Sequence, residues 1–155
     1  MIGLSAYVYS MCENKIVGAF IFGLGLLTIC TFKLNLFTGK VGEASIKDIE
    51  LLEATFLANA LGIIIAMLLF KFAPGFISEG IACGSLMQMG VALYSKHPWA
   101  TVACVAAFLL SGSKHCIAMI FNYQASIEWL VLLLLTIIGN FVGAKIIALS
   151  GITRN

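Results

Sequence analysis

The sequence predicts an all-α integral membrane protein, a helical bundle with an internal repeat and two broken helices. Three observations predict this class: the composition, the length of the apolar segments, and two polar interruptions that are each followed by an N-x-x-G motif. Hydrophobic residues make up 61% of the chain and charged residues 10%, and the mean hydropathy is +1.07. Because soluble domains are about half apolar and a quarter charged, much of this surface must face lipid.

Five apolar segments are long enough to cross a bilayer as helices, which takes roughly 20 residues for about 30 Å of hydrocarbon. Pro74 and Pro98 lie at segment boundaries, where proline interrupts a helix least. Trp99 and Trp129 lie at segment starts, where indole rings favour the headgroup level. We expect one transmembrane domain over residues 1–155, with spans at about 16–38, 54–72, 76–95, 98–122 and 128–149.

Two of these segments carry small and polar residues at the depth of the membrane interior. The first segment ends in K-L-N-L-F-T-G-K over residues 33–40, and the fourth contains S-G-S-K-H-C over residues 111–116. Non-helical backbone at this depth is tolerated only where protein buries it or where it faces a cavity. We therefore expect a broken helix at each place.

An N-x-x-G motif occurs in the span that follows each break, as Asn59 with Gly62 and as Asn140 with Gly143. One span separates the two units, and an odd number of spans inverts the second unit, so we predict an inverted repeat. A complete repeat would have three spans in each half. Residues 1–12 are too short to span, so the sequence predicts that the first helix is missing. Small-residue spacing predicts helix packing at Asn59, Gly62, Gly139, Asn140 and Gly143.

His115 is the strongest candidate for chemistry, because an ionisable side chain inside a span is costly and usually functional. Its unperturbed pKa of about 6.5 would let it exchange protons near neutrality. The alternative is a neutral histidine that is hydrogen-bonded between helices. Lys114 could concentrate anions or extend its ammonium group to the interface. Thr38 could donate a hydrogen bond to an anion, or the Thr38–Gly39 pair could simply end a helix.

The chain carries no pattern that is typical of an enzyme, such as HExxH, GxSxG, a Walker loop or a carboxylate pair within a span. The five cysteines form no CxxC pair and four lie in apolar segments, which favours packing over a disulfide framework or a metal site. Nine Lys and Arg against seven Asp and Glu, without a basic cluster, give no sign of nucleic-acid binding. We expect no enzyme activity, no cofactor or metal, and the lipid bilayer as a partner.

Four motifs together resemble the formate/nitrite transporter family. Residues 36–40, LFTGK, resemble its L-F-T-G-N loop, and residues 108–115, FLLSGSKH, resemble its F-x-x-S-G-F-E-H run. Residues 138–143, IGNFVG, are similar to its L-G-N-x-x-G-G motif, and residues 80–83, GIAC, to G-I-L-C. The motifs stand in the right order over residues 16–149. The resemblance implies a shortened member that lacks the first transmembrane helix and has the aquaporin-like inverted-repeat fold.

The resemblance also implies roles for single residues. It implies two apolar constrictions on either side of a chamber that contains the central histidine, His115, and the loop threonine, Thr38. The constriction residues would be Phe22 and Leu26 on the cytoplasmic side, and Leu36, Phe37 and Phe108 on the other.

Three positions depart from the family pattern. Lys114 stands where the family has glutamate, Gly84 replaces an asparagine of helix four, and Met119 replaces an asparagine after the histidine. The family's glutamate and helix-four asparagine are thought to contact one another, so both losses form one coupled change that makes the chamber more positive.

The function that the resemblance implies is passage of small monovalent anions or their conjugate weak acids, such as formate, nitrite or hydrosulfide. Passage would be passive, or coupled to protons through His115, in a homopentamer of the prokaryotic plasma membrane. Two alternatives stay open: a channel for neutral solutes such as water or ammonia, and a non-transporting accessory membrane subunit. A cytoplasmic C-terminus agrees with the positive-inside bias; it places Lys40, Lys47, Lys96 and Arg154 inside.

Overall fold

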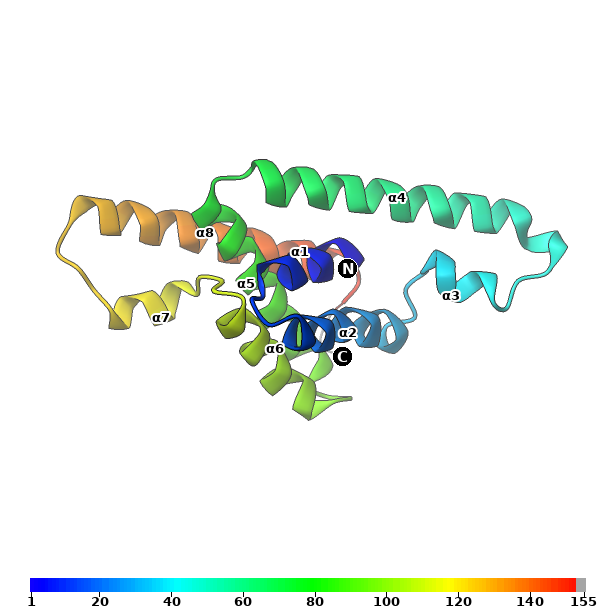
Figure 1. Ribbon diagram of the computed structural model, residues 1–155, viewed down its shortest axis with the longest axis horizontal. Helices are drawn as coiled ribbons and strands as arrows, with labels where there is room; N and C mark the ends of the chain where they lie inside the picture. Colours follow the sequence, from blue (N-terminus) through cyan, green and yellow to red (C-terminus); the bar gives the residue numbers. More distant parts are fainter. Residues whose placement is uncertain (153–155) are drawn as a thin grey trace.

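A computed structural model describes residues 1–152, so Arg154 and its part in the predicted orientation lie outside the described residues. Within residues 1–152 the chain is helical and has no strand, which confirms the predicted all-α class (Figure 1). The elements are α1 Ile2–Met11, α2 Lys15–Thr31, α3 Phe37–Val41, the 3₁₀ turn η1 Ile46–Asp48, α4 Ile49–Phe72, α5 Gly75–Leu93, α6 Pro98–Leu110, α7 Cys116–Phe121 and α8 Ile127–Leu149.

Three helical stretches among the described residues are long and apolar enough to cross a membrane: Ile46–Phe72, Gly75–Leu93 and Ile127–Leu149. These helices give the chain the character of a membrane protein. Helices α2 and α6 are apolar but have only 17 and 13 residues. At about 1.5 Å per residue, neither reaches across about 30 Å of hydrocarbon. The five-span count therefore stays a prediction.

The helices form a central bundle with two arms that project in opposite directions (Figure 1). Helices α1, α2, α5 and α6 lie in the bundle. Helix α3 and the start of α4 form the arm on the right of the view, whereas α7 and the start of α8 form the arm on the left. Helix α1 packs on α2 and α4, and α5 packs on α6 and α8. The chain thus contains two sets of four helices with matching neighbours.

Helix α5 is the centre of the fold. In the 18-residue apolar stretch of α5, 67% of the residues are buried. The corresponding share is 22% in α8 and 6% in the stretch Ile46–Phe72, which contains α4. Its close partner is α8, because glycines remove the side chains between the two backbones. A Cβ on Gly139 would lie 2.7 Å from the Ile77 carbonyl oxygen and 3.0 Å from the Gly80 Cα, and one on Gly84 would overlap the Asn140 carbonyl. The α5–α8 contact is therefore a backbone-to-backbone contact that tolerates no added carbon.

Residues 1–12, which were expected to be too short to span, contain the ten-residue helix α1 in the core of the bundle. Leu4 and Val8 are buried. The Tyr7 ring stacks on Phe70 of α4 with the centroids 4.3 Å apart, and its hydroxyl donates to Ser78 Oγ of α5 at 3.1 Å. Helix α1 therefore ties the end of α4 to the start of α5.

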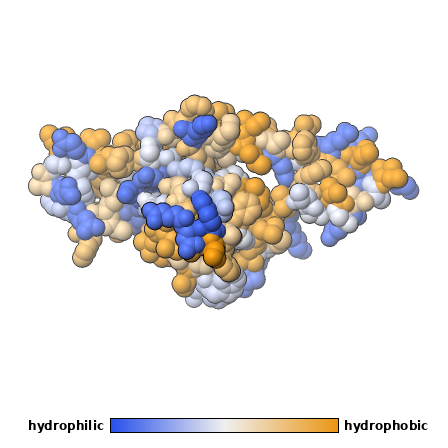
Figure 2. Space-filling model, viewed as in Figure 1, coloured by the Kyte–Doolittle hydropathy of each residue, from blue (hydrophilic) through white to orange (hydrophobic). Residues whose placement is uncertain are grey.

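Apolar side chains cover much of the outer surface, including the exposed length of α4 (Figure 2). In the same view, hydrophilic side chains gather at the two far ends and over the turn between α1 and α2. Large apolar side chains along α4 are exposed in the single chain, as expected where a helix faces lipid.

Candidate functional site: two broken helices

The first predicted break occupies residues 32–36, between α2 and α3. Helix α2 ends in a Schellman turn, in which the Lys33 N–H donates to the Cys30 carbonyl at 3.3 Å and the Leu34 N–H to the Ile29 carbonyl at 2.9 Å. Lys33 takes the left-handed backbone conformation that this turn requires, with φ of 52°. Leu36 then extends the chain and precedes the first residue of α3.

The second predicted break, over residues 111–115, repeats this geometry between α6 and α7. The Gly112 N–H donates to the Leu109 carbonyl at 3.2 Å and the Ser113 N–H to the Phe108 carbonyl at 3.0 Å. Gly112 holds the left-handed position with φ of 69°, and His115 extends the chain before α7. Position by position, Lys33 corresponds to Gly112 and Leu36 to His115.

The left-handed position predicts opposite effects for two substitutions. Lys33→Gly is expected to stabilise the protein and Gly112→Ala to destabilise it, each by about 1 kcal/mol, because a Cβ is unfavourable at positive φ. Thermal unfolding of the detergent-solubilised protein measures both effects. Lys40→Gly, inside α3, is the control and should destabilise. Shifts of the same sign for Lys33→Gly and Gly112→Ala would contradict the assignment.

Asn59 of α4 fixes the first break from the side. Its Oδ1 accepts from the Phe37 N–H at 2.9 Å, and its Nδ2 donates to the Asn35 carbonyl at 3.1 Å. These two backbone groups lie on either side of Leu36, so the Asn59 amide holds the backbone before and after that residue. The Phe37 ring also contacts Phe56 edge-on at 5.1 Å, which holds α3 against α4.

Asn140 of α8 fixes the second break in the same way. Its Oδ1 accepts from the Cys116 N–H at 2.9 Å, and its Nδ2 donates to the Lys114 carbonyl at 2.8 Å. The flanked residue is now His115. The same Nδ2 also donates to the Gly80 carbonyl of α5 at 2.9 Å, so the break is tied to the central helix.

A cavity of about 670 Å³ lies beside the first break, between α1, α2, α3 and α4. Five residues that the family resemblance placed along a pore line it: Phe22, Leu26, Leu36, Phe37 and Thr38. The remaining lining residues are Met1, Ile2, Gly3, Ile29, Leu34, Asn35, Phe56, Ala58, Asn59, Ala60, Gly62, Ile63 and Ala66. The side chains are mainly apolar, with an amide or hydroxyl at only three positions and no ionisable side chain.

His115 is half-buried at the start of α7. Its Nδ1 accepts from the Ala118 N–H at 3.3 Å, so the neutral ring would carry its proton on Nε2. The ring lies 5.7 Å from that of Phe108, the predicted constriction residue of α6. Lys114, beside it, is also half-buried, and so is Met119 on α7.

The predicted pathway residues thus fall into two groups. Phe22, Leu26 and residues 36–38 share the cavity beside the first break, whereas Phe108 and His115 contact one another at the second. Helix α3, which carries Thr38, and the start of α7, at His115, lie in opposite arms (Figure 1). The structure therefore does not bring Thr38 and His115 into one chamber.

The glycines predicted to pack between helices differ in whether they contact another helix. A Cβ on Gly139 or Gly143 would meet the α5 backbone, whereas a Cβ on Gly62 would meet no atom within 4 Å. The hydrogen bonds by which Asn59 and Asn140 hold the two breaks could not be derived from packing motifs. Four of the five bonds join residues 22 to 26 positions apart in the chain, and the fifth joins Asn140 to Gly80, 60 positions away. The signal in the sequence was the recurrence of N-x-x-G after each break.

No group of three or more His, Cys, Asp or Glu side chains that could hold a metal ion occurs within residues 1–152. Comparison of the chain with protein-family models, with curated proteins and with solved structures finds no match in any of the three.

Proposed function

We propose that this chain is a member of the formate/nitrite transporter family and passes small monovalent anions or their conjugate weak acids across a membrane. The observation that carries the proposal is the pair of helix breaks, each held by two hydrogen bonds from an asparagine side chain to the backbone. Helices α2 and α6 each end at a break of the same geometry, and an N-x-x-G asparagine in a later helix holds each break. Broken helices of this kind build substrate sites in transporters.

The proposal includes an aquaporin-like inverted repeat in which α1–α4 form one half and α5–α8 the other. Its support is the matching set of neighbours, since α1 packs on α2 and α4 as α5 packs on α6 and α8. Helix α1 would then be the counterpart of α5.

The apolar lining beside the first break suggests how permeation would work. A bare anion loses its hydration in such a constriction at a large cost in free energy, whereas the neutral acid loses far less. Thr38 would hydrogen-bond the permeant species, Lys114 would attract its anion, and His115 would exchange the proton. The proposal requires the two arms to lie closer together in the assembled homopentamer than in the single chain.

Formate uptake into proteoliposomes tests the proposal at about pH 5 and about pH 7.5, on either side of the unperturbed histidine pKa. We expect saturable uptake that is faster at the lower pH, because the neutral acid is then more populated. His115→Asn should weaken this pH dependence. His97→Asn is the matched control, since His97 is the other histidine and lies in the turn before α6.

Two results would contradict the proposal. Equal uptake at both pH values in wild type and His115→Asn would exclude proton exchange at His115. No uptake at either pH by folded, oligomeric protein would exclude an autonomous weak-acid channel.

A channel for small neutral solutes is the second candidate, and the mainly apolar lining of the cavity favours it. Flux of ammonia or water that excess formate does not inhibit would support this function. Competition by formate would support the weak-acid channel.

A further inference from the structure

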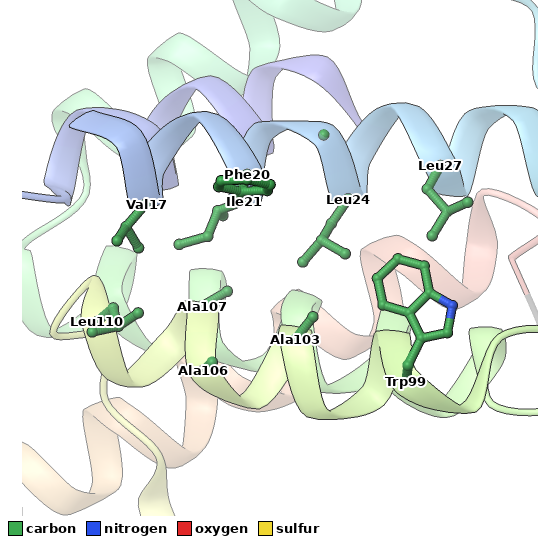
Figure 3. A pocket seen from close by; sticks show the side chains of 11 residues that line it. Val17, Phe20, Ile21, Leu24, Leu27, Trp99, Ala103, Ala106, Ala107 and Leu110 are labelled. Atoms are coloured by element: carbon green, nitrogen blue, oxygen red, sulfur yellow. The ribbon is translucent and has the colours of Figure 1, made fainter. Parts of the chain in front are cut away.

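An apolar groove of about 450 Å³ runs between α2 and α6 (Figure 3). The groove exists because α6 presents alanines where α2 presents large side chains. Figure 3 shows Leu24 opposite Ala103 and Ile21 opposite Ala107. A methyl group cannot reach across to the facing helix, so the space between the helices stays open. The groove can therefore accept a row of large side chains from a further helix.

The length of the groove sets what such a helix must present. The groove runs along α2 from Val17 to Leu27 and along α6 from Trp99 to Leu110. At about 1.5 Å per residue these stretches are about 15–17 Å long, or about three helical turns. A helix that fits the groove must therefore carry one large apolar side chain per turn over that length.

Helix α4 carries such a row, which we call the α4 row: Leu57, Leu61, Ile65 and Leu68. Its members are spaced by four, four and three residues, so they lie on one face of the helix. Each member is between 48% and 66% exposed in the single chain. The row spans about 16 Å, which is the length of the groove.

The contacts of α4 within its own chain come from the opposite face. Asn59 holds the first break, a Cβ on Gly3 of α1 would overlap that of Ala66, and Phe70 stacks on Tyr7. Asn59 and Ala66 each precede a member of the α4 row by two positions, which is a rotation of about 200° around a helix. The α4 row therefore points away from the contacts that α4 makes in its own chain.

The α4 row and the α6 side of the groove have the same spacing. The groove residues of α6 with this spacing are Trp99, Ala103, Ala107 and Leu110. When the two helices lie in parallel, Leu61 and Ile65 each face an alanine, so large side chains meet small ones. The reverse direction also places two large side chains on the alanines. Packing alone therefore does not select the direction of α4.

One end of the groove, where α6 begins, is basic. Lys96 precedes α6, and its Nζ lies 5.0 Å from the centre of the Phe32 ring, just after the end of α2. Lys33 is the next residue after Phe32, and both lysines are exposed. No Asp or Glu occurs in residues 27–34 or 93–100.

Charge selects the direction of α4 in the groove. Glu50 and Glu53 are exposed before the α4 row, and Lys71 is exposed after it. With α4 parallel to α6 the two carboxylates lie at the basic end, whereas the reverse direction would bring Lys71 there. The far end of the groove carries both signs, in Glu13 and Lys15, and does not discriminate.

We infer that the groove binds α4 of a second copy of this chain, with the α4 row between α2 and α6 and with Glu53 at Lys96. Helix α2 runs opposite to α6 across the groove and opposite to α4 within one chain (Figure 3 and Figure 1). A second copy whose α4 is parallel to α6 therefore points the same way as the first. Each copy offers one helix and accepts another, and such a heterologous contact builds a closed ring. The inference does not depend on what the protein transports.

Disulfide crosslinking tests the contact. Leu61→Cys and Ala103→Cys are placed on two differently tagged full-length copies that are expressed together. Both copies also carry Cys30→Ser and Cys116→Ser, which removes the two native cysteines that are not buried. Oxidation by copper–phenanthroline in lipid vesicles should give a heterodimer, and either variant alone should give no dimer.

A second pair and two exchanged pairs measure the direction. Leu68→Cys with Leu110→Cys should crosslink as well, because these positions lie together at the far end of the groove. Leu61→Cys with Leu110→Cys, and Leu68→Cys with Ala103→Cys, should not crosslink. Each exchanged pair is out of register by seven residues, which is about 10 Å along a helix.

Charge reversal tests why this direction is chosen. Glu53→Lys on the copy that offers α4 should lower the yield of the first crosslink by about fivefold at a low protein-to-lipid ratio, since one exposed ion pair contributes up to roughly that factor. Lys96→Glu on the copy that offers the groove should restore the yield. Glu128→Lys, at the start of α8, makes the same change in net charge and should leave the yield unchanged.

Three outcomes would overturn the inference. Crosslinking of the exchanged pairs in place of the matched pairs would show that the copies point in opposite directions. A dimer formed by Leu61→Cys alone would show that α4 meets α4 of a second copy across a two-fold axis. No crosslink in any pair, in protein that stays folded, would show that no second copy occupies the groove. None of these readouts involves formate uptake, so the contact can fail while the proposed function holds, and the reverse.

Discussion

Gly143→Ala is expected to destabilise the protein by about 3 kcal/mol, which is at the upper end for a single overpacked carbon. The added Cβ would overlap the Ile81 carbonyl and lie 2.9 Å from the Ser85 nitrogen. Both are backbone atoms of α5, so no side chain can move aside to make room. The helices would have to separate, and the hydrogen bond from Ser85 Oγ to the Gly143 carbonyl, 3.1 Å long, would be lost.

Gly62→Ala is the matched control, because Gly62 holds the same place in the other N-x-x-G motif. Its Cβ would meet no atom within 4 Å, so the substitution should leave stability unchanged or raise it by up to about 1 kcal/mol through better helix propensity. Thermal unfolding in detergent, followed by size-exclusion chromatography of heated samples, compares the two. Equal shifts for both variants would show that α5 and α8 are not in backbone contact.

Asn140→Leu has the second-largest expected effect. Leucine keeps the approximate size but leaves the Cys116 N–H and the Lys114 and Gly80 carbonyls without their partner. An unpartnered buried group costs about 1–3 kcal/mol, and these groups are only partly buried, so we expect a loss of about 2 kcal/mol in all and a loosened second break. Asn59→Leu releases only two groups, one of them in an exposed hydrogen bond, and should cost about half as much.

Maleimide labelling detects the loosened break independently of stability. Cys116 is half-buried at the start of α7, and its labelling, measured by peptide mass spectrometry, should accelerate in Asn140→Leu and stay slow in Asn59→Leu. Cys30 is exposed and serves as the internal reference, with the same rate in all three proteins. Unchanged Cys116 labelling in a folded Asn140→Leu protein would show that the amide does not hold the break.

The positions of both breaks were predictable from local sequence. Gly112 with two flanking serines, and the Asn35 and Thr38–Gly39 positions around the first break, disfavour continued helix in an otherwise apolar span. The structure ends α2 and α6 at these places. Lys33 was not recognisable as the left-handed residue of the first break, because lysine has no preference for positive φ.

The place of α1 was not predictable. Its ten residues are too few to cross a bilayer, and the sequence offered no sign that Tyr7 would stack on Phe70 and hydrogen-bond to Ser78, more than sixty residues away. The separation of the predicted pathway residues into two groups likewise depends on contacts between segments far apart in the chain. Phe22 and residues 36–38 line one cavity because α2 and the first break lie beside each other, whereas His115 lies in the opposite arm.

The sequence by itself determined the apolar, helical character of this protein, the two interruptions and the recurrence of an asparagine after each one. These are local properties, set by the cost of burying polar backbone in lipid and by the conformational preferences of a few residues. Only the tertiary structure decided which N-x-x-G glycine contacts another helix, what each asparagine binds and where an apolar groove remains between α2 and α6. Those features depend on how closely two helix backbones approach, and the approach is set by all the side chains between them.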